Sequence, residues 1–234
     1  MSRTRRALIA AILAIFALAL IALMPLALGL RLCGLEHAGL TARTASGSIW
    51  SGRLEGARLG PVTLGAVRTR LQLFPLLAAR ARLDLSGVAG TGGISVSPGS
   101  RGIDDVTAVL PLAAALGPLP VDRLALEDVS VQFAGGRCAR AEGRVRATFS
   151  GPVAGLALPG GMAGTARCDG DVLALTLTDQ SALETLTLRI EDSGRYRARL
   201  VIRAVDPTLA PALSAAGFRP AGAGLALPFS GTLG

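Results

Sequence analysis

Residues 184–203 read ETLTLRIEDSGRYRARLVIR, and this stretch decides the fold class. Apolar residues occupy every second position from Leu186 to Ile190 and again from Tyr196 to Ile202, with threonine or arginine between most of them. Successive side chains of a strand point to opposite faces of a sheet. The stretch therefore predicts two antiparallel strands with one apolar face and one face toward water.

The same period of two recurs along most of the chain. The other strands are expected at 48–59, 62–73, 81–88, 94–96, 106–110, 129–133, 145–149, 173–177 and 225–229. Gly60-Pro61 favours a hairpin between the first two, and Gly52, Gly56 and Gly65 suggest bulges or close packing. We expect a mainly β domain, a curved antiparallel sheet or an open barrel-like body whose closure the pattern leaves open.

Three short helices are expected beside the strands. They are predicted at 76–79, at 111–116, where Pro111 takes the first helical position, and at 207–217, where Asp206 is the N-cap and Pro207 the first helical residue. The segment 111–120 is the candidate midpoint between two halves of one fold.

The N-terminal residues have the pattern of a membrane anchor. Basic residues within 1–6 precede an unbroken apolar run, 7–30. At about 1.5 Å per residue this run is long enough to cross a hydrocarbon core about 30 Å thick. We expect cytoplasmic residues 1–6, a transmembrane segment 7–30, a juxtamembrane segment 31–40 and a periplasmic domain 41–234, in the bacterial inner membrane. A cleaved signal peptide and a lipid-modified Cys33 are the alternatives.

Charge narrows the range of partners. The net charge is +8, and all 24 basic side chains are arginine. The arginines are scattered and aromatic residues make up only 3% of the chain, which disfavours nucleic acid as a partner. One row is concentrated, at Arg195, Arg197, Arg199 and Arg203. It can meet an acidic partner or lipid phosphate, or it can be the solvated face of a strand.

The sequence shows no clear pattern of catalytic residues. The only histidine, His37, is in the juxtamembrane segment, which argues against a serine triad and against zinc. Paired carboxylates such as Asp104-Asp105 fall at strand ends or turns, and Asp169-Gly170-Asp171 fits a hairpin turn better than a calcium loop. We expect no catalytic residue, no metal and no cofactor.

Two cysteines, Cys138 and Cys168, lie deep in the domain. In an oxidising space they would form a disulfide, and the alternative is two buried free thiols.

Several segments resemble one family. Ser48-Ile49-Trp50-Ser51-Gly52 is followed by glycine-punctuated strands and Phe74-Pro75-Leu76, then by Cys138 with Gly164–Gly170, and by Gly194-Arg195-Tyr196. Together they resemble the type II secretion system protein N family. Cys138 and Cys168 look like the paired cysteines of that family. A Trp-x-Gly hairpin before β-repeats also occurs in AsmA-like envelope proteins, which handle lipid.

The resemblance implies a single-pass, non-catalytic inner-membrane component of the type II secretion machinery. Its expected partners are other type II secretion proteins of the inner membrane or the secretin, and membrane lipid through the anchor. An exposed strand edge or the arginine row would make the contacts, and Trp50 is either a contact residue or part of the core. The alternative function is a lipid-binding β groove.

Overall fold

The computed structural model describes residues 12, 19, 23–26, 28, 40–59, 62–111, 121–151, 161–203, 208–222 and 224–232. The strands are β1 (Leu40–Thr41), β2 (Thr44–Gly47), β3 (Gly52–Leu59), β4 (Val62–Leu71), β5 (Ala81–Gly87), β6 (Gly90–Ser97), β7 (Ser100–Pro111), β8 (Val121–Ala134), β9 (Arg137–Phe149), β10 (Met162–Asp169), β11 (Val172–Thr178), β12 (Glu184–Ile190), β13 (Arg195–Ile202), β14 (Arg219–Ala221) and β15 (Gly224–Thr232). Two helices are described, α3 (Leu73–Leu76) and α4 (Ala210–Ala215).

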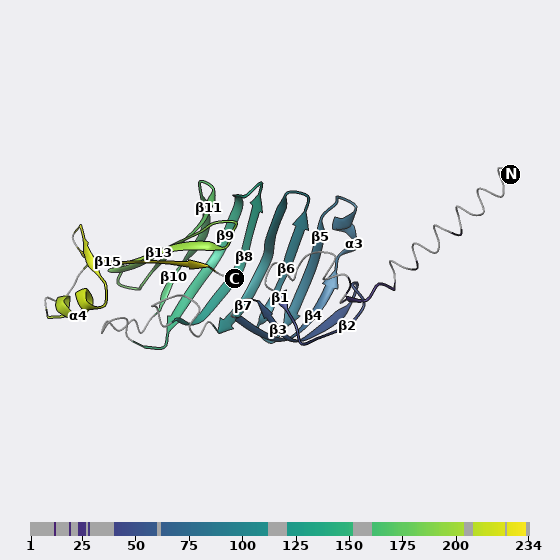
Figure 1. The fold of residues 1–234 in the computed structure, drawn as a ribbon, viewed down its shortest axis with the longest axis horizontal. Helices are drawn as coiled ribbons and strands as arrows, with labels where there is room; N and C mark the ends of the chain where they lie inside the picture. The colour runs from purple at the N-terminus through teal and green to yellow at the C-terminus, as the bar shows by residue number, and fades with distance from the viewer. Residues whose placement is uncertain are drawn as a thin grey trace.

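All the described strands belong to one antiparallel sheet. From β3 to β13 each strand pairs with the next along the chain, so the sheet is an extended meander (Figure 1). β1 and β2 lie at one end beside β3, and at the other end β15 pairs with β13 and carries β14. The two ends do not pair with each other among the described strands, so the sheet is open. The expectation of a mainly β, antiparallel fold with a few short helices is confirmed.

The alternation predicted from residues 184–203 sorts the side chains as expected. Ala166, Leu175, Leu188, Ala198 and Phe229 lie at directly opposed positions of five neighbouring strands and form one apolar row. The next row, on the opposite face, consists of Thr165, Thr176, Thr187, Arg199 and Pro228. Burying apolar area on one face is the main stabilising contribution such a sheet can make.

The apolar face contains two clusters. The larger runs from β8 to β15 and also includes Val62 of β4 and Leu213 of α4. The smaller consists of Leu26, Leu54, Ala57 and Val67. The far ends of β3 and β4 curl back toward β7 (Figure 1), and Leu64 packs against both clusters.

Irregular pairing marks a line across four strands. The ladder is interrupted at Gly92 in β6, Asp105 in β7, Asp128 in β8 and Gly143 in β9. Asp105 and Asp128 have φ of 51° and 50°, and the backbone N–H group of each donates to a side-chain hydroxyl on the neighbouring strand, at 2.9 and 3.1 Å. Bulges bend and twist a strand locally. Their alignment on neighbouring strands concentrates such bending and twisting along one line across the sheet.

Near the N-terminus the expected hairpin and bulges are present. β3 and β4 pair with Leu59 opposite Val62, and register shifts surround Ala57. Gly56 and Gly65 have φ of 62° and 75°, a conformation that glycine adopts without strain. The first strand begins at Gly52 rather than at residue 48, because residues 48–51 form the turn after β2.

The helices differ from expectation. α3 spans Leu73–Leu76 instead of 76–79, because Pro75 lies in the first helical turn, where its missing N–H costs no hydrogen bond. α4 begins at Ala210 with Leu209 as N-cap, and the expected N-cap Asp206 and first helical residue Pro207 lie outside the described residues. Pro211 is the proline near this helix start. β6 and β7 are longer than the short strands expected there.

Some expectations fall outside the described residues. They include most of the anchor 7–30 and the juxtamembrane segment, and the helix at 111–116 apart from Pro111, which ends β7. Within the described part of the chain, none of the helices has the length and apolar character needed to span a bilayer.

Candidate interaction site

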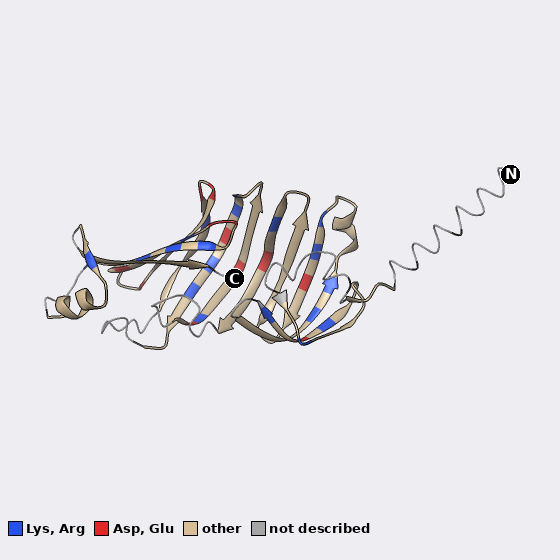
Figure 2. Cartoon of the chain, viewed as in Figure 1, with Lys and Arg blue, Asp and Glu red and all other residues tan. Residues whose placement is uncertain are grey.

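The predicted arginine row lies on the polar face of β13, toward the C-terminal end of the sheet (Figure 2). Arg195 donates to Glu191 at 2.7 Å, and Arg197 lies 4.0 Å from the same carboxylate. Within the described residues, Arg199 and Arg203 have no ion-pair partner. The row therefore divides into two arginines that share one carboxylate and two that have no ion-pair partner among the described residues.

A free strand edge lies beside this row. β15 pairs with β13 from Leu225 to Thr232, but on its outer side β14 reaches only as far as Ala226. None of the described strands covers the outer edge of residues 227–232. Unpaired backbone groups on a strand edge are a template for another strand.

The cysteines form a disulfide, with their Cα atoms 5.6 Å apart. The ladder between β9 and β10 ends at the pair Arg144 and Thr165, so the remainder of these strands separates. Beyond that point the Cys138 N–H donates to the carbonyl oxygen of Asp171 at 2.9 Å. The disulfide thus connects the β8–β9 hairpin to the β10–β11 hairpin beyond the end of the β9–β10 ladder.

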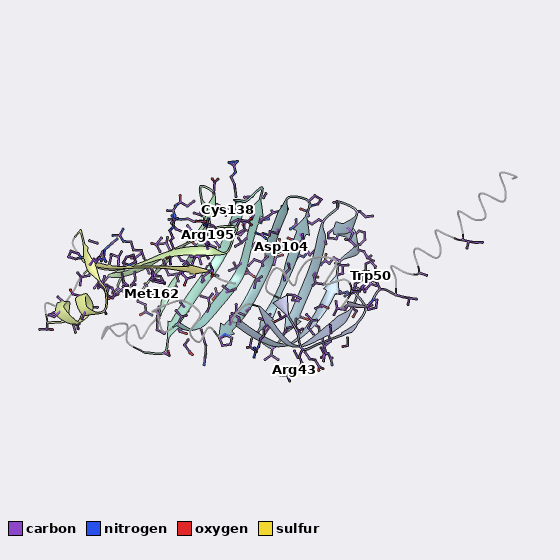
Figure 3. All side chains as sticks on the ribbon, in the orientation of Figure 1. Arg43, Trp50, Asp104, Cys138, Met162 and Arg195 are labelled. Atoms are coloured by element: carbon purple, nitrogen blue, oxygen red, sulfur yellow. A yellow bond between two sulfur atoms is a disulfide. The ribbon has the colours of Figure 1, made fainter. Side chains whose placement is uncertain are left out.

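Trp50 lies at the other end of the sheet, far from Arg195 (Figure 3). It is half-buried in the turn before β3. In the same turn Ser48 pairs with Pro25, and the Ile49 N–H donates to the carbonyl oxygen of Met24 at 3.1 Å. Trp50 and the arginine row are two separate places, and the structure does not combine them into one site.

A hollow beside this turn was missed by the sequence analysis. Its volume is about 560 Å³. It is lined by Ser46, Gly47, Ser51, Gly52, Arg53, Arg68, Thr69, Arg70, Asp84 and Ser86. The pattern Arg68-Thr69-Arg70 was a signal for two arginines on one face, but only the register of β3 against β4 brings Arg53 opposite Arg68.

One buried acid lies at the tip of the β11–β12 hairpin. Glu184 is 8% exposed, and the Ser181 hydroxyl donates to it at 3.3 Å while also contacting Asp179. Burial raises the pKa of Glu184, and the neighbouring Asp179 carboxylate raises it further. For Asp179, burial is outweighed by hydrogen bonds from Ser181 and from the Glu184 N–H, which lower its pKa well below the usual range.

The described residues contain no group of three or more His, Cys, Asp or Glu side chains arranged to hold a metal ion.

Comparison with known proteins supports one family. The family model of type II secretion system (T2SS), protein N, matches residues 38–227. No curated protein and no solved structure matches the chain.

Proposed function

Because the chain belongs to the type II secretion system protein N family, we propose that it is a non-catalytic component of this machinery, anchored in the inner membrane by residues 7–30 with its β domain in the periplasm. The apolar run of 7–30 behind basic residues supports the anchor, and the disulfide between Cys138 and Cys168 supports an oxidising compartment.

The observation that carries the binding role is the outer edge of β15. A partner strand that adds to residues 227–232 would satisfy backbone groups that the described strands leave unpaired. Arg199 and Arg203 lie on the neighbouring strand or directly after it, and would attract an acidic partner to this edge.

Complementation tests the role and the anchor. In cells that lack the gene, a protein exported by the system should accumulate in the periplasm, and the full chain should restore its release. A chain without residues 1–30, exported by a cleavable signal, should fail to restore it. Normal release in the deletion strain would contradict the role in secretion, and full rescue by the truncated chain would contradict the anchor.

Photo-crosslinking tests the edge. A crosslinking amino acid at Ser230, on the free edge, should capture another secretion protein. The matched control is Thr165, which is exposed but lies on β10, between two paired strands. Equal capture at both positions, or capture at neither, would contradict an edge-specific contact.

A lipid-binding groove is a second candidate. Several large apolar residues of the apolar face are only partly buried, including Ile103, Leu124, Leu126 and Phe133. An open sheet with such a face can hold acyl chains. Native mass spectrometry of the full chain should then show co-purifying lipid, and a chain free of adducts would contradict this function.

A further inference from the structure

We propose that the hollow lined by Arg53, Arg68 and Arg70 binds the phosphate of an anionic lipid headgroup. Arg53 lies directly opposite Arg68 in the β3–β4 pair, and Arg70 follows two residues later on the same face. Like charges at opposed positions of a sheet repel each other and destabilise the pairing. A bound anion would relieve this repulsion.

The described residues do not supply that anion. None of these three arginines has an ion pair with a described carboxylate. The one acid that lines the hollow, Asp84, accepts from Gln72 Nε2 at 2.6 Å through Oδ2 and from Arg82 Nε at 3.1 Å through Oδ1. Among the described residues that line the hollow, three arginines therefore share one carboxylate, Asp84, which lies opposite Arg70 but accepts its hydrogen bonds from Gln72 and Arg82.

The other lining groups suit phosphate. Ser46, Ser51 and Ser86 line the hollow together with the arginines and bring hydroxyl groups to it. Phosphate takes hydrogen bonds from hydroxyl and guanidinium donors, and arginine can bind it through two parallel bonds.

Three features at the same sheet edge favour a lipid as the source of the phosphate. Gly52 pairs with Thr69, so the Trp50 turn lies beside the end of β4, where α3 follows. α3 and the next residue expose apolar side chains, with Phe74 86% and Leu77 87% exposed. Pro25, near the end of the apolar N-terminal run, pairs with the same turn. This arrangement puts apolar side chains and phosphate-binding groups together, as at a bilayer surface.

The proposal rests on the proposed inner-membrane location for its lipid source, but binding can be measured without secretion. Trp50 is the only tryptophan and adjoins Ser51 of the hollow, so its fluorescence reports occupancy. The full chain in a neutral detergent is titrated with dihexanoyl-phosphatidylglycerol, with dihexanoylglycerol, which lacks phosphate, and with inorganic phosphate. We expect saturable binding of the phospholipid, at least tenfold weaker binding of inorganic phosphate and no response to dihexanoylglycerol.

Two sets of variants localise the binding. Changing Arg53, Arg68 and Arg70 together to Gln should weaken phospholipid binding at least tenfold. The matched control, with Arg146, Arg167 and Arg219 changed to Gln, removes equal charge from arginines outside the hollow and should bind as the parent does. A Phe74→Ser, Leu77→Ser variant should weaken phospholipid binding and leave phosphate binding unchanged.

Three results would overturn the proposal. The first is the absence of a saturable response, and the second is an equal loss in the two arginine variants, which would indicate unspecific attraction. The third is equal affinity for phospholipid and inorganic phosphate, which would reject the lipid as the source.

Discussion

At the residue scale, Thr69 carries an unsatisfied group. It is 2% exposed on the apolar face, opposite Leu85, and its hydroxyl has no hydrogen-bond partner within the described part of the chain. A buried polar group without a partner costs about 1–3 kcal/mol. Thr69→Val keeps the shape and removes the hydroxyl, so we expect unfolding to require about 1 kcal/mol more, measured by urea titration. Thr165→Val, at an exposed position, is the control, and an equal gain there would contradict the explanation.

The acid at the β11–β12 hairpin gives a prediction about pH. The pKa of Glu184 is raised in the folded state, so the fold holds this proton to higher pH than the unfolded chain does. Its contribution to stability therefore falls as pH rises from about 4.3 through the raised value. A Glu184→Gln variant has no carboxyl group to ionise and does not lose this stability as pH rises. Its melting temperature should exceed that of the parent protein at pH 7 and approach the parent's value near pH 4.

The control for Glu184 is an exposed acid. Glu127→Gln alters a surface ion pair with Arg144, and such a pair contributes little to stability. A Glu184→Gln gain that is constant from pH 4 to pH 7 would contradict the role of the raised pKa.

At the element scale, the disulfide adds a covalent link between two hairpins beyond the end of the β9–β10 ladder. It closes a loop of about 31 residues, for which chain entropy predicts a stabilisation of about 3–4 kcal/mol. Changing Cys138 and Cys168 together to Ser should lower the free energy of unfolding by about this amount, and the parent with a reducing agent should behave alike. Identical unfolding of the parent and the variant without reductant would contradict the bridge.

The elements also show what a sequence can and cannot predict here. Local signals located the strand pairs well: the period of two at Leu186–Ile190 and the Gly60-Pro61 turn depend only on neighbouring residues. The expected start of α3 at residue 76 is three residues too late, because the first helical turn tolerates Pro75. The hollow lined by arginines could not be predicted from the sequence, because Arg53 lies opposite Arg68 only through the register of β3 against β4.

At the scale of the whole molecule, the sheet carries two apolar clusters that meet on β4, where Val62 belongs to the larger cluster, Val67 to the smaller, and Leu64 packs against both. Most strands contact only their sequence neighbours, so the smaller cluster around Leu26 and Leu54 can open without the larger one. Leu26→Ala and Leu200→Ala both truncate a buried leucine, 2% and 0% exposed, and each should cost about 2–5 kcal/mol locally. Hydrogen exchange should show Leu26→Ala lowering protection in β3 and β4 alone, and Leu200→Ala lowering it from β8 to β15. An equal loss in β12 and β13 for both variants would mean that the sheet unfolds as one unit.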